Sequence, residues 1–93
     1  MNSWTGRGAA TRVYSPDFDA DFSRLPYKIQ RQIEEKLDSM GLRLREYPHY
    51  RLTGHSEYRF RVGDHRVIYE FDAQQNVIYV LAVGNRDKIY KKV

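Results

Sequence analysis

Apolar residues recur at helical intervals in the first half of the chain. They fall four, four and three positions apart, at Ile29, Ile33, Leu37 and Met40. These intervals place the four side chains on one stripe of a helix. The residues between them are mostly charged or amide, as expected for a solvated face. The pattern predicts a helix that begins at Pro26 and ends at Gly41, because glycine commonly terminates helices.

A shorter helix is predicted just upstream. Ser15 precedes Pro16, an order typical of a helix cap and first turn. Asp17 and Asp19 follow, where the start of a helix favours negative charge. Three apolar residues then fall at helical spacing, namely Phe18, Phe22 and Leu25. Two adjacent helices separated by a proline predict a helical hairpin.

The apolar period changes to two residues from position 58 onward. Apolar and polar residues alternate over 58–62 and again over 65–72, which is typical of strands. Gly63 and Asp64 lie between these segments and favour a tight turn. The sequence therefore predicts a β-hairpin over residues 58–72.

Three further segments complete the expected fold. Residues 73–76, AQQN, predict a turn. Residues 77–83, VIYVLAV, are apolar throughout, which predicts a central strand covered on both faces. Residues 11–15 predict a short strand near the beginning of the chain.

Residues 42–57 predict a connecting loop, because they mix polar residues with a proline and a glycine. Within it we expect Leu42 and Leu44 to pack as anchors. His49 and His55 are expected at the surface, since they lie in a polar loop.

The predicted elements are a strand, a helical hairpin, three antiparallel strands and a short polar tail or helix over 84–93. This order predicts an α+β fold with helices on one face of a single sheet. A chain of 93 residues is expected to form one domain. We place the domain at 11–93, after a loose leader over 1–10.

Three arginines are interleaved with the apolar residues of the predicted hairpin. Arg59 and Arg61 alternate with residues expected to face the helices, so both should lie on the opposite face, and Arg66 on the paired strand should join them. Like charges this close are mildly destabilising. Either the face is solvated and partly balanced by Glu70 and Asp72, or it binds an anion. Phosphate is the obvious candidate, because arginine offers permanently charged bidentate donors.

The tail adds further cations and an aromatic hydroxyl, at Arg86, Lys88, Lys91, Lys92 and Tyr90. No other recognisable apparatus competes with this basic set. The sequence has no glycine-rich phosphate loop, no metal-ligand cluster and no nucleophile-elbow motif. We therefore expect neither a cofactor nor a metal.

Composition narrows the class of protein. The chain has no cysteine, which excludes disulfides and thiolate metal sites. It has no apolar run long enough for a membrane helix and no stretch typical of a signal peptide. We expect a cytoplasmic protein without a membrane partner. The net charge of +4 favours anionic partners without naming one.

Residues 52–90, LTGHSEYRFRVGDHRVIYEFDAQQNVIYVLAVGNRDKIY, resemble the RelE/ParE family of toxins from type II toxin–antitoxin systems. The shared pattern is a Leu-x-Gly lead-in, a basic strand, Gly-Asp-x-Arg followed by Ile-Tyr, an apolar strand, and Gly-x-Arg followed by Tyr. The helical hairpin extends the resemblance to about residues 11–92. The resemblance implies a RelE-like fold and, for RelE-type members, cleavage of mRNA on the ribosome.

The resemblance also implies site residues. It assigns the basic and aromatic positions of the active site to Arg59, Arg61, Arg66, Arg86 and Tyr90. Further candidates for RNA binding are Arg51, His65, Lys88 and Lys91, with His65 also a reserve candidate for the general base. The founding RelE has lysines where Arg59 and Arg61 stand, and many relatives have histidine or lysine where Asn85 stands.

Three function classes stay open at this point. ParE-type members share the fold but poison DNA gyrase, and they generally lack the basic set. Retention of Arg66, Arg86 and Tyr90 favours a metal-independent endoribonuclease. A non-catalytic RNA-binding module is the third possibility. The partners implied by the resemblance are a RelB-like antitoxin, mRNA and the ribosome.

Overall fold

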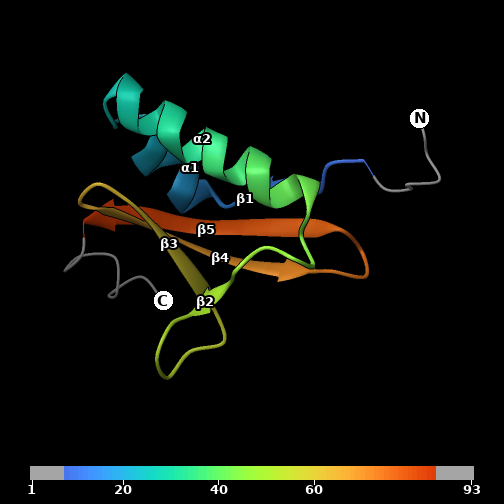
Figure 1. The fold of residues 1–93 in the computed structure, drawn as a ribbon. Coiled ribbons are helices and arrows are strands. Elements are labelled where there is room, and N and C mark those ends of the chain that lie inside the picture. Colours follow the sequence, from blue (N-terminus) through green and yellow to red (C-terminus); the bar gives the residue numbers. More distant parts are fainter. Residues whose placement is uncertain (1–7, 86–93) are drawn as a thin grey trace.

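The structure, a computed structural model, describes residues 8–85 of the chain (Figure 1). Two helices and a sheet follow one another in an α+β arrangement. The elements in chain order are β1 (Thr11–Tyr14), α1 (Pro16–Phe22), α2 (Tyr27–Leu42), β2 (Tyr50–Arg51), β3 (Tyr58–Val62), β4 (His65–Asp72) and β5 (Val77–Asn85).

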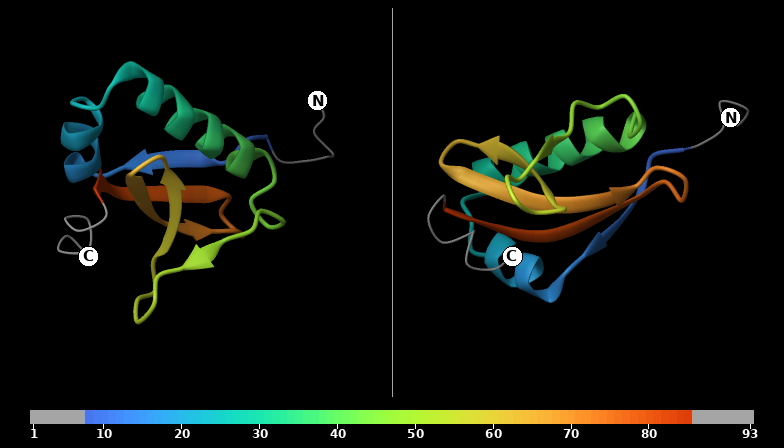
Figure 2. Two further views of the ribbon diagram at one scale, coloured as in Figure 1. Left: turned by 60° about the vertical axis from the view of Figure 1, so that its left-hand side comes forward. Right: turned by 90° about the horizontal axis from the view of Figure 1, so that it is seen from below.

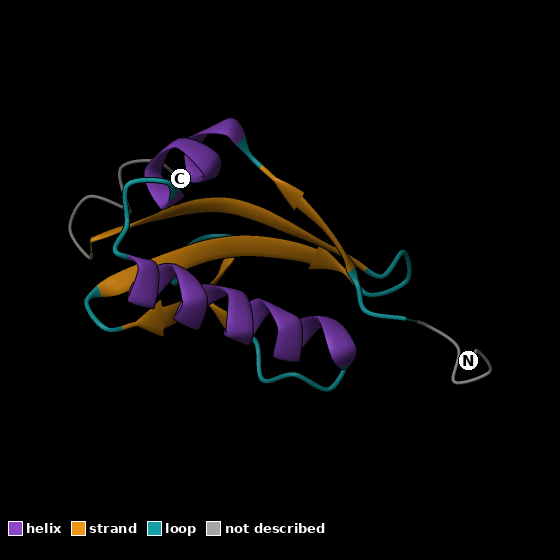
Figure 3. Cartoon of the chain, turned by 90° about the horizontal axis from the view of Figure 1, so that it is seen from above, coloured by secondary structure: helices purple, strands orange, loops and turns teal. Residues whose placement is uncertain are grey.

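The five strands form one sheet in the order β1-β5-β4-β3-β2. Strand β1 runs parallel to β5, with Thr11 opposite Val77, and the other neighbours are antiparallel. The first strand thus lies beside the last of the described strands. The views in Figure 2 show the two helices on the same face of the sheet. Figure 3 views the molecule from above and shows α1 close to β1 and β5, while α2 lies nearer β3. The predicted α+β class, with helices on one face, is confirmed.

The main core lies between the helices and the sheet. The stripe of α2 predicted from its spacing is buried at Ile33, Leu37 and Met40, each at most 1% exposed. Residues of the two central strands meet them, and the fully buried ones are Val67, Tyr69, Ile78, Val80 and Val83. Within residues 8–85, no helix is long and apolar enough to cross a membrane.

Ser15 is the cap of α1, as predicted. Its Oγ accepts a hydrogen bond from the backbone N–H of Phe18 at 3.0 Å. The same hydroxyl donates to the carbonyl oxygen of Leu81. One side chain therefore ends the first strand, begins α1 and ties the helix to β5.

Helix α2 starts after Pro26, as predicted, but it does not end at Gly41. It continues through Leu42, and Gly41 is buried inside it. The reason is packing: the N–H of Ala10 donates to the Gly41 carbonyl at 2.9 Å, and a Cβ on Gly41 would lie 3.4 Å from the Ala10 nitrogen. Ala10, which falls in the expected leader, is only 7% exposed. The rest of that leader, over 1–7, lies outside the described residues.

The connection over 42–57 contains a strand that the sequence did not predict, β2. Leu44 anchors this segment as predicted, with 4% of its surface exposed. The prediction for Leu42 was wrong, because its side chain is 75% exposed. Leu52 is the second anchor, at 3% exposure.

The two predicted turns are confirmed. Gly63 has a φ of 59°, a left-handed value that glycine adopts without strain, and Asn76 ends the next turn with a φ of 59°. Strand β5 is longer than predicted, since Gly84 and Asn85 belong to it and not to a tail. Residues 86–93, where a helical turn was expected, lie outside the described residues.

Candidate functional site

The hairpin arginines lie on one face of the sheet, as the alternation predicts. Arg61 is directly opposite Arg66 across the β3–β4 pair, and Arg59 is opposite Ile68. The intervening pair, Phe60 and Val67, belongs to the core beneath the helices. The three side chains therefore leave the backbone on the face opposite α1 and α2, which we call the arginine face (residues Arg59, Arg61 and Arg66). Arg61 also lines a pocket together with Gln32, Glu35 and Lys36 of α2.

The arginine face has an apolar floor. Leu52, Ile68 and Ala82 form a second small cluster, and each is at most 3% exposed. Its members come from the segment after β2, from β4 and from β5. Exposure differs among the arginines: Arg61 is exposed, Arg59 half-buried, and Arg66 only 9% exposed. Arg66 points away from the main core and is still held within the protein surface.

Within residues 8–85, no ion pair joins Arg59 or Arg61 to a carboxylate. Glu70 instead accepts a hydrogen bond from the Ser56 hydroxyl at 3.3 Å, and Asp72 accepts one from the backbone N–H of Gln75 at 3.0 Å. Partial balance of the face by Glu70 and Asp72 stays a prediction, since neither carboxylate forms a direct ion pair with Arg59 or Arg61 among the described residues. Arg59 and Arg61 are therefore two permanent charges that no carboxylate of the described residues pairs with directly.

His65 lies on the other side of the sheet from the arginines. It is opposite Val62, and the alternation along β4 directs it to the helix side. Its Nδ1 is buried and has no hydrogen-bond partner among the described residues. Its predicted roles in RNA binding and as a reserve base stay predictions.

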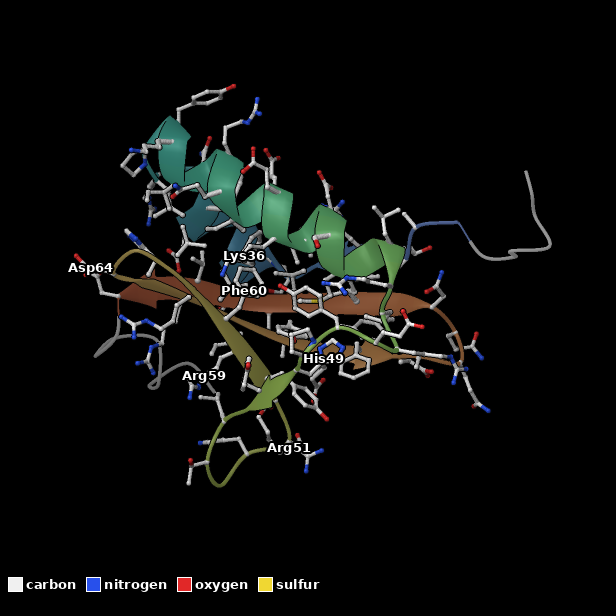
Figure 4. The ribbon with its side chains drawn as sticks, viewed as in Figure 1. Lys36, His49, Arg51, Arg59, Phe60 and Asp64 are labelled. Atoms are coloured by element: carbon white, nitrogen blue, oxygen red, sulfur yellow. The ribbon has the colours of Figure 1, made fainter. Side chains whose placement is uncertain are left out.

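Arg51 also lies on the helix side. It is paired with Tyr58 across β2 and β3, donates to the Tyr58 hydroxyl at 2.9 Å, and places its guanidinium 5.2 Å from the centre of that ring. Figure 4 shows Arg51 and Arg59 near the short β2–β3 pairing. Arg51 thus secures β2 and is not part of the arginine face.

Tyr50 is a member of the arginine face that the sequence analysis missed. It lies directly opposite Arg59, and its side chain is 63% exposed. The signal could not be found in the sequence, because β2 is only two residues long and shows no alternation.

His49, which was expected at the surface, is half-buried, and both of its ring nitrogens have hydrogen-bond partners. Its Nε2 lies 2.7 Å from the carbonyl oxygen of Leu44, and its Nδ1 lies 2.6 Å from the hydroxyl of Tyr69. Because a carbonyl only accepts, Nε2 carries the hydrogen and Nδ1 accepts from Tyr69. The imidazole ring of His49, which is labelled in Figure 4, stacks on the ring of Phe71 with 3.9 Å between the ring centroids. Burial raises the pKa of Tyr69 above its ordinary value, so its hydroxyl keeps the donated proton.

Four of the predicted site residues lie outside the described residues: Arg86, Lys88, Tyr90 and Lys91. Among residues 8–85, no group of three histidine, cysteine or acidic side chains has an arrangement that could hold a metal ion. The chemistry of the described part of the face is therefore that of arginine and tyrosine side chains.

Comparison with known proteins shows which family and which solved structures this chain is similar to. The profile of the family described as "ParE toxin of type II toxin-antitoxin system, parDE" matches residues 13–90. A variant of the E. coli toxin RelE in the free state is 18% identical with a TM-score of 0.75, over 91% of this chain and 94% of that chain. No curated protein matches the sequence significantly.

Two archaeal complexes are more similar in sequence. The toxin of the RelE–RelB complex from Pyrococcus horikoshii OT3 is 25% identical with a TM-score of 0.70, over 87% of this chain and 99% of that chain. The RelB–RelE antitoxin–toxin complex from Methanococcus jannaschii gives 27% identity and a TM-score of 0.61, over 85% of this chain and 95% of that chain. With the family profile spanning most of the sequence, the protein belongs to the RelE/ParE family of toxins from type II toxin–antitoxin systems.

Proposed function

We propose that this toxin is a metal-independent endoribonuclease that cleaves mRNA on the ribosome and so inhibits translation. The observation that carries the proposal is the pairing of Arg61 with Arg66 directly across two strands, with Arg59 on the same face. Like charges in this position weaken a sheet. Such an arrangement is expected where it serves an anion, and RNA phosphate is the anion that arginine suits best.

The proposed reaction uses the RNA itself as the nucleophile. The 2′-oxygen attacks the adjacent phosphorus, the bond from phosphorus to the 5′-oxygen breaks, and a 2′,3′-cyclic phosphate forms. The attacking hydroxyl loses its proton and the leaving 5′-oxygen gains one. Arg61 and Arg66, with Arg86, stabilise the negative charge on the phosphoryl oxygens. Arg59 holds the RNA backbone or neutralises the leaving oxygen.

Proton transfer is the weak point of this site, and that weakness explains the proposed dependence on the ribosome. Arginine does not deprotonate in proteins, so none of the three described arginines can act as the base. Tyr90 is our candidate for stacking on a base or transferring a proton. An enzyme with little acid–base power depends on a substrate already held in a reactive shape. A decoding site supplies mRNA in such a restrained state.

Brief induction of the toxin in cells tests the proposal. We expect translation to stop before DNA replication, and primer extension to map new breaks in cellular mRNA. Arg61→Gln should lower the cleavage rate by roughly 100- to 1,000-fold, the scale seen when one donor to a charged transition state is lost. Arg45→Gln, an exposed arginine in the connection after α2, is the matched control and should cleave normally.

The chemistry of the product ends gives an independent check. Intramolecular attack predicts a 2′,3′-cyclic phosphate, or the 3′-phosphate derived from it, in the presence of a chelator once the ribosomal complex has been stabilised by other means. A 3′-hydroxyl with a 5′-phosphate on the downstream fragment would contradict the mechanism.

A second function deserves a direct comparison, because the matching family profile is that of the ParE toxins. Members of that type act on DNA gyrase. If replication stops first while mRNA stays intact, and purified toxin inhibits supercoiling by gyrase, the gyrase function replaces the ribonuclease.

We also propose a small acidic antitoxin as the natural partner. The archaeal relatives were solved as complexes of RelE with RelB, which supports a partner of this kind. An acidic segment would complement Arg59 and Arg61, which form no ion pair with a carboxylate in the part of the chain that the structure describes. The apolar part of the contact fits the helical hairpin, where a shallow pocket is lined by Tyr14, Phe18, Asp19, Phe22, Glu34 and Leu37.

A further inference from the structure

We infer that Tyr50 and Arg59 together form a subsite for one unpaired nucleotide, with the base stacked on Tyr50 and its phosphate held by Arg59. The subsite lies beside the Arg61–Arg66 pair, so the inference rests on the proposed ribonuclease function and names how that site holds its RNA.

The register of the sheet places the two side chains together. Tyr50 and Arg59 are direct partners across β2 and β3. Direct partners share a face, and their Cβ atoms lie about 5 Å apart. Arg61 is two residues further along the same strand, which is about 7 Å at the usual rise per residue. The ring and the cation pair are therefore within the reach of neighbouring nucleotides.

Tyr50 has no evident role in holding the fold. Its side chain is 63% exposed, and among the described residues its ring contacts no other aromatic ring and its hydroxyl makes no hydrogen bond. Tyr58, by contrast, contacts His49, Tyr69 and Phe71 and pairs with Arg51. A large aromatic side chain left free on a cationic face is available for a ligand.

The backbone under Tyr50 is nevertheless fixed on both sides. His49 before it is bonded through both ring nitrogens. Arg51 after it is locked onto Tyr58, and Leu52 is buried in the floor of the arginine face. A free ring on a fixed backbone is pre-organised, because little freedom remains to be lost when a ligand binds.

The chemistry of the pair selects the ligand class. A phenol ring stacks on any nucleobase, but only on one that is unpaired and exposed. A neighbouring guanidinium binds the phosphate. Aromatic rings interleaved with cations are the usual composition of single-strand nucleic-acid sites. The ligand is therefore a single-stranded segment, and a duplex would not fit the stacking requirement.

The test measures binding of a short, fluorescein-labelled 2′-O-methyl RNA by fluorescence anisotropy, since this RNA lacks the attacking hydroxyl and stays intact. Tyr50→Ala should weaken binding about 5- to 100-fold, the range for loss of one stacked base, while Tyr50→Phe stays within about two-fold of the parent. Tyr27→Ala is the matched control, because Tyr27 is 71% exposed and lies on α2. Thermal unfolding checks that each variant is folded.

Two further readouts separate stacking from charge. The dependence of affinity on salt should be unchanged in Tyr50→Ala but shallower in Arg59→Gln, because only the arginine releases a counterion. An abasic version of the oligonucleotide should bind the parent more weakly and bind Tyr50→Ala with almost no further loss. A structural role for Tyr50 would not produce that pattern.

The outcomes are distinguishable. If the parent protein binds the RNA and cleaves mRNA but Tyr50→Ala behaves like Tyr27→Ala, the subsite is overturned and the ribonuclease stands. Equal losses for the parent and Tyr50→Ala with the abasic RNA also overturn the subsite. If the parent neither binds RNA nor cleaves mRNA, the ribonuclease function and the subsite both fail.

Discussion

At the scale of single residues, the contact between His49 and Tyr69 joins the loop before β2 to the centre of the sheet. Tyr69 is fully buried, and its hydroxyl donates to the Nδ1 of His49. The other ring nitrogen is satisfied by Leu44. Removing one member would leave a buried polar atom without its partner, which costs about 1–3 kcal/mol. The pair therefore stabilises the segment that presents Tyr50.

Tyr69→Phe tests this contact and its pH dependence. The raised pKa of Tyr69 means that the folded protein keeps this proton after the unfolded chain, with a pKa of about 10, has lost it. The contribution of the hydroxyl is thus fully present below about pH 10 and is lost as pH rises above it, by up to about 1.4 kcal/mol per pH unit. Urea unfolding of both proteins from neutral to alkaline pH measures the difference.

We expect the parent to be more stable than Tyr69→Phe by about 1–3 kcal/mol at neutral pH. The advantage should then shrink above about pH 10. Taking the difference between the two proteins cancels the titration of the other tyrosines and the lysines. A difference that stays constant over the whole range would show that Tyr69 titrates normally in the folded state.

At the scale of elements, the sequence predicted those helices and strands that have a regular apolar period. It did not predict features that are very short or that depend on contacts distant in sequence. The stripe of α2, the alternation of β3 and β4, and the cap at Ser15 are local patterns, and the structure confirms them. Strand β2 has only two residues and is held by tertiary contacts of its neighbours. The burial of His49 depends on Tyr69, which is 20 positions away along the chain.

Within the candidate site, too, some residues could be placed from local sequence patterns and others could not. Alternation correctly grouped Arg59, Arg61 and Arg66 on one face, because side-chain direction in a strand is a local property. It could not place Tyr50, which needs the register between β2 and β3. His65 was grouped with Arg66 because the two are neighbours in sequence. Neighbouring residues of a strand point to opposite faces, so His65 lies on the helix side.

Gly41 gives a prediction at this scale, because it lies inside a helix against Ala10. Gly41→Ala should stabilise the protein by about 0.5–1 kcal/mol, since alanine favours the helix. The added Cβ would lie 3.4 Å from the Ala10 nitrogen, an ordinary contact. Gly41→Leu should instead destabilise by about 1–3 kcal/mol, because a longer side chain displaces Ala10 and its hydrogen bond. Urea unfolding of the three proteins measures both effects. Equal stability of the alanine and leucine variants would show that Ala10 does not pack against α2.

At the scale of the whole molecule, part of the positive charge is gathered on one face of the sheet. The chain carries a net charge of +4, and Arg59 and Arg61, which form no ion pair within residues 8–85, lie on the face opposite α1 and α2. Charges at an exposed rim mainly speed association, and apolar contacts set how long a complex lasts. A partner that covers both the arginine face and the helical hairpin should therefore show two separable kinetic effects.

The predicted antitoxin can be tested with the product of the neighbouring gene. Raising salt should lower its association rate by about 10-fold or more, while the dissociation rate changes little. Surface-based or stopped-flow kinetics at low and high salt give both rates. Arg61→Gln should reduce the salt dependence of association, and Arg45→Gln serves as the control. A complex that dissociates completely at moderate salt would show that charge, and not apolar contact, holds the partner.

The parallel pairing of β1 with β5 determines how late during its synthesis this toxin can complete its sheet. Residues 11–14 find their sheet partners only at 77–80, so the edge of the sheet formed by β1 cannot pair until residues 77–80 have been synthesised. Contacts so distant in sequence form late and slowly compared with local ones. A ribosome translating this gene is therefore not exposed to a toxin with a complete sheet before residues 77–80 have been made. An antitoxin already present in the cell is then in place when its folded target forms.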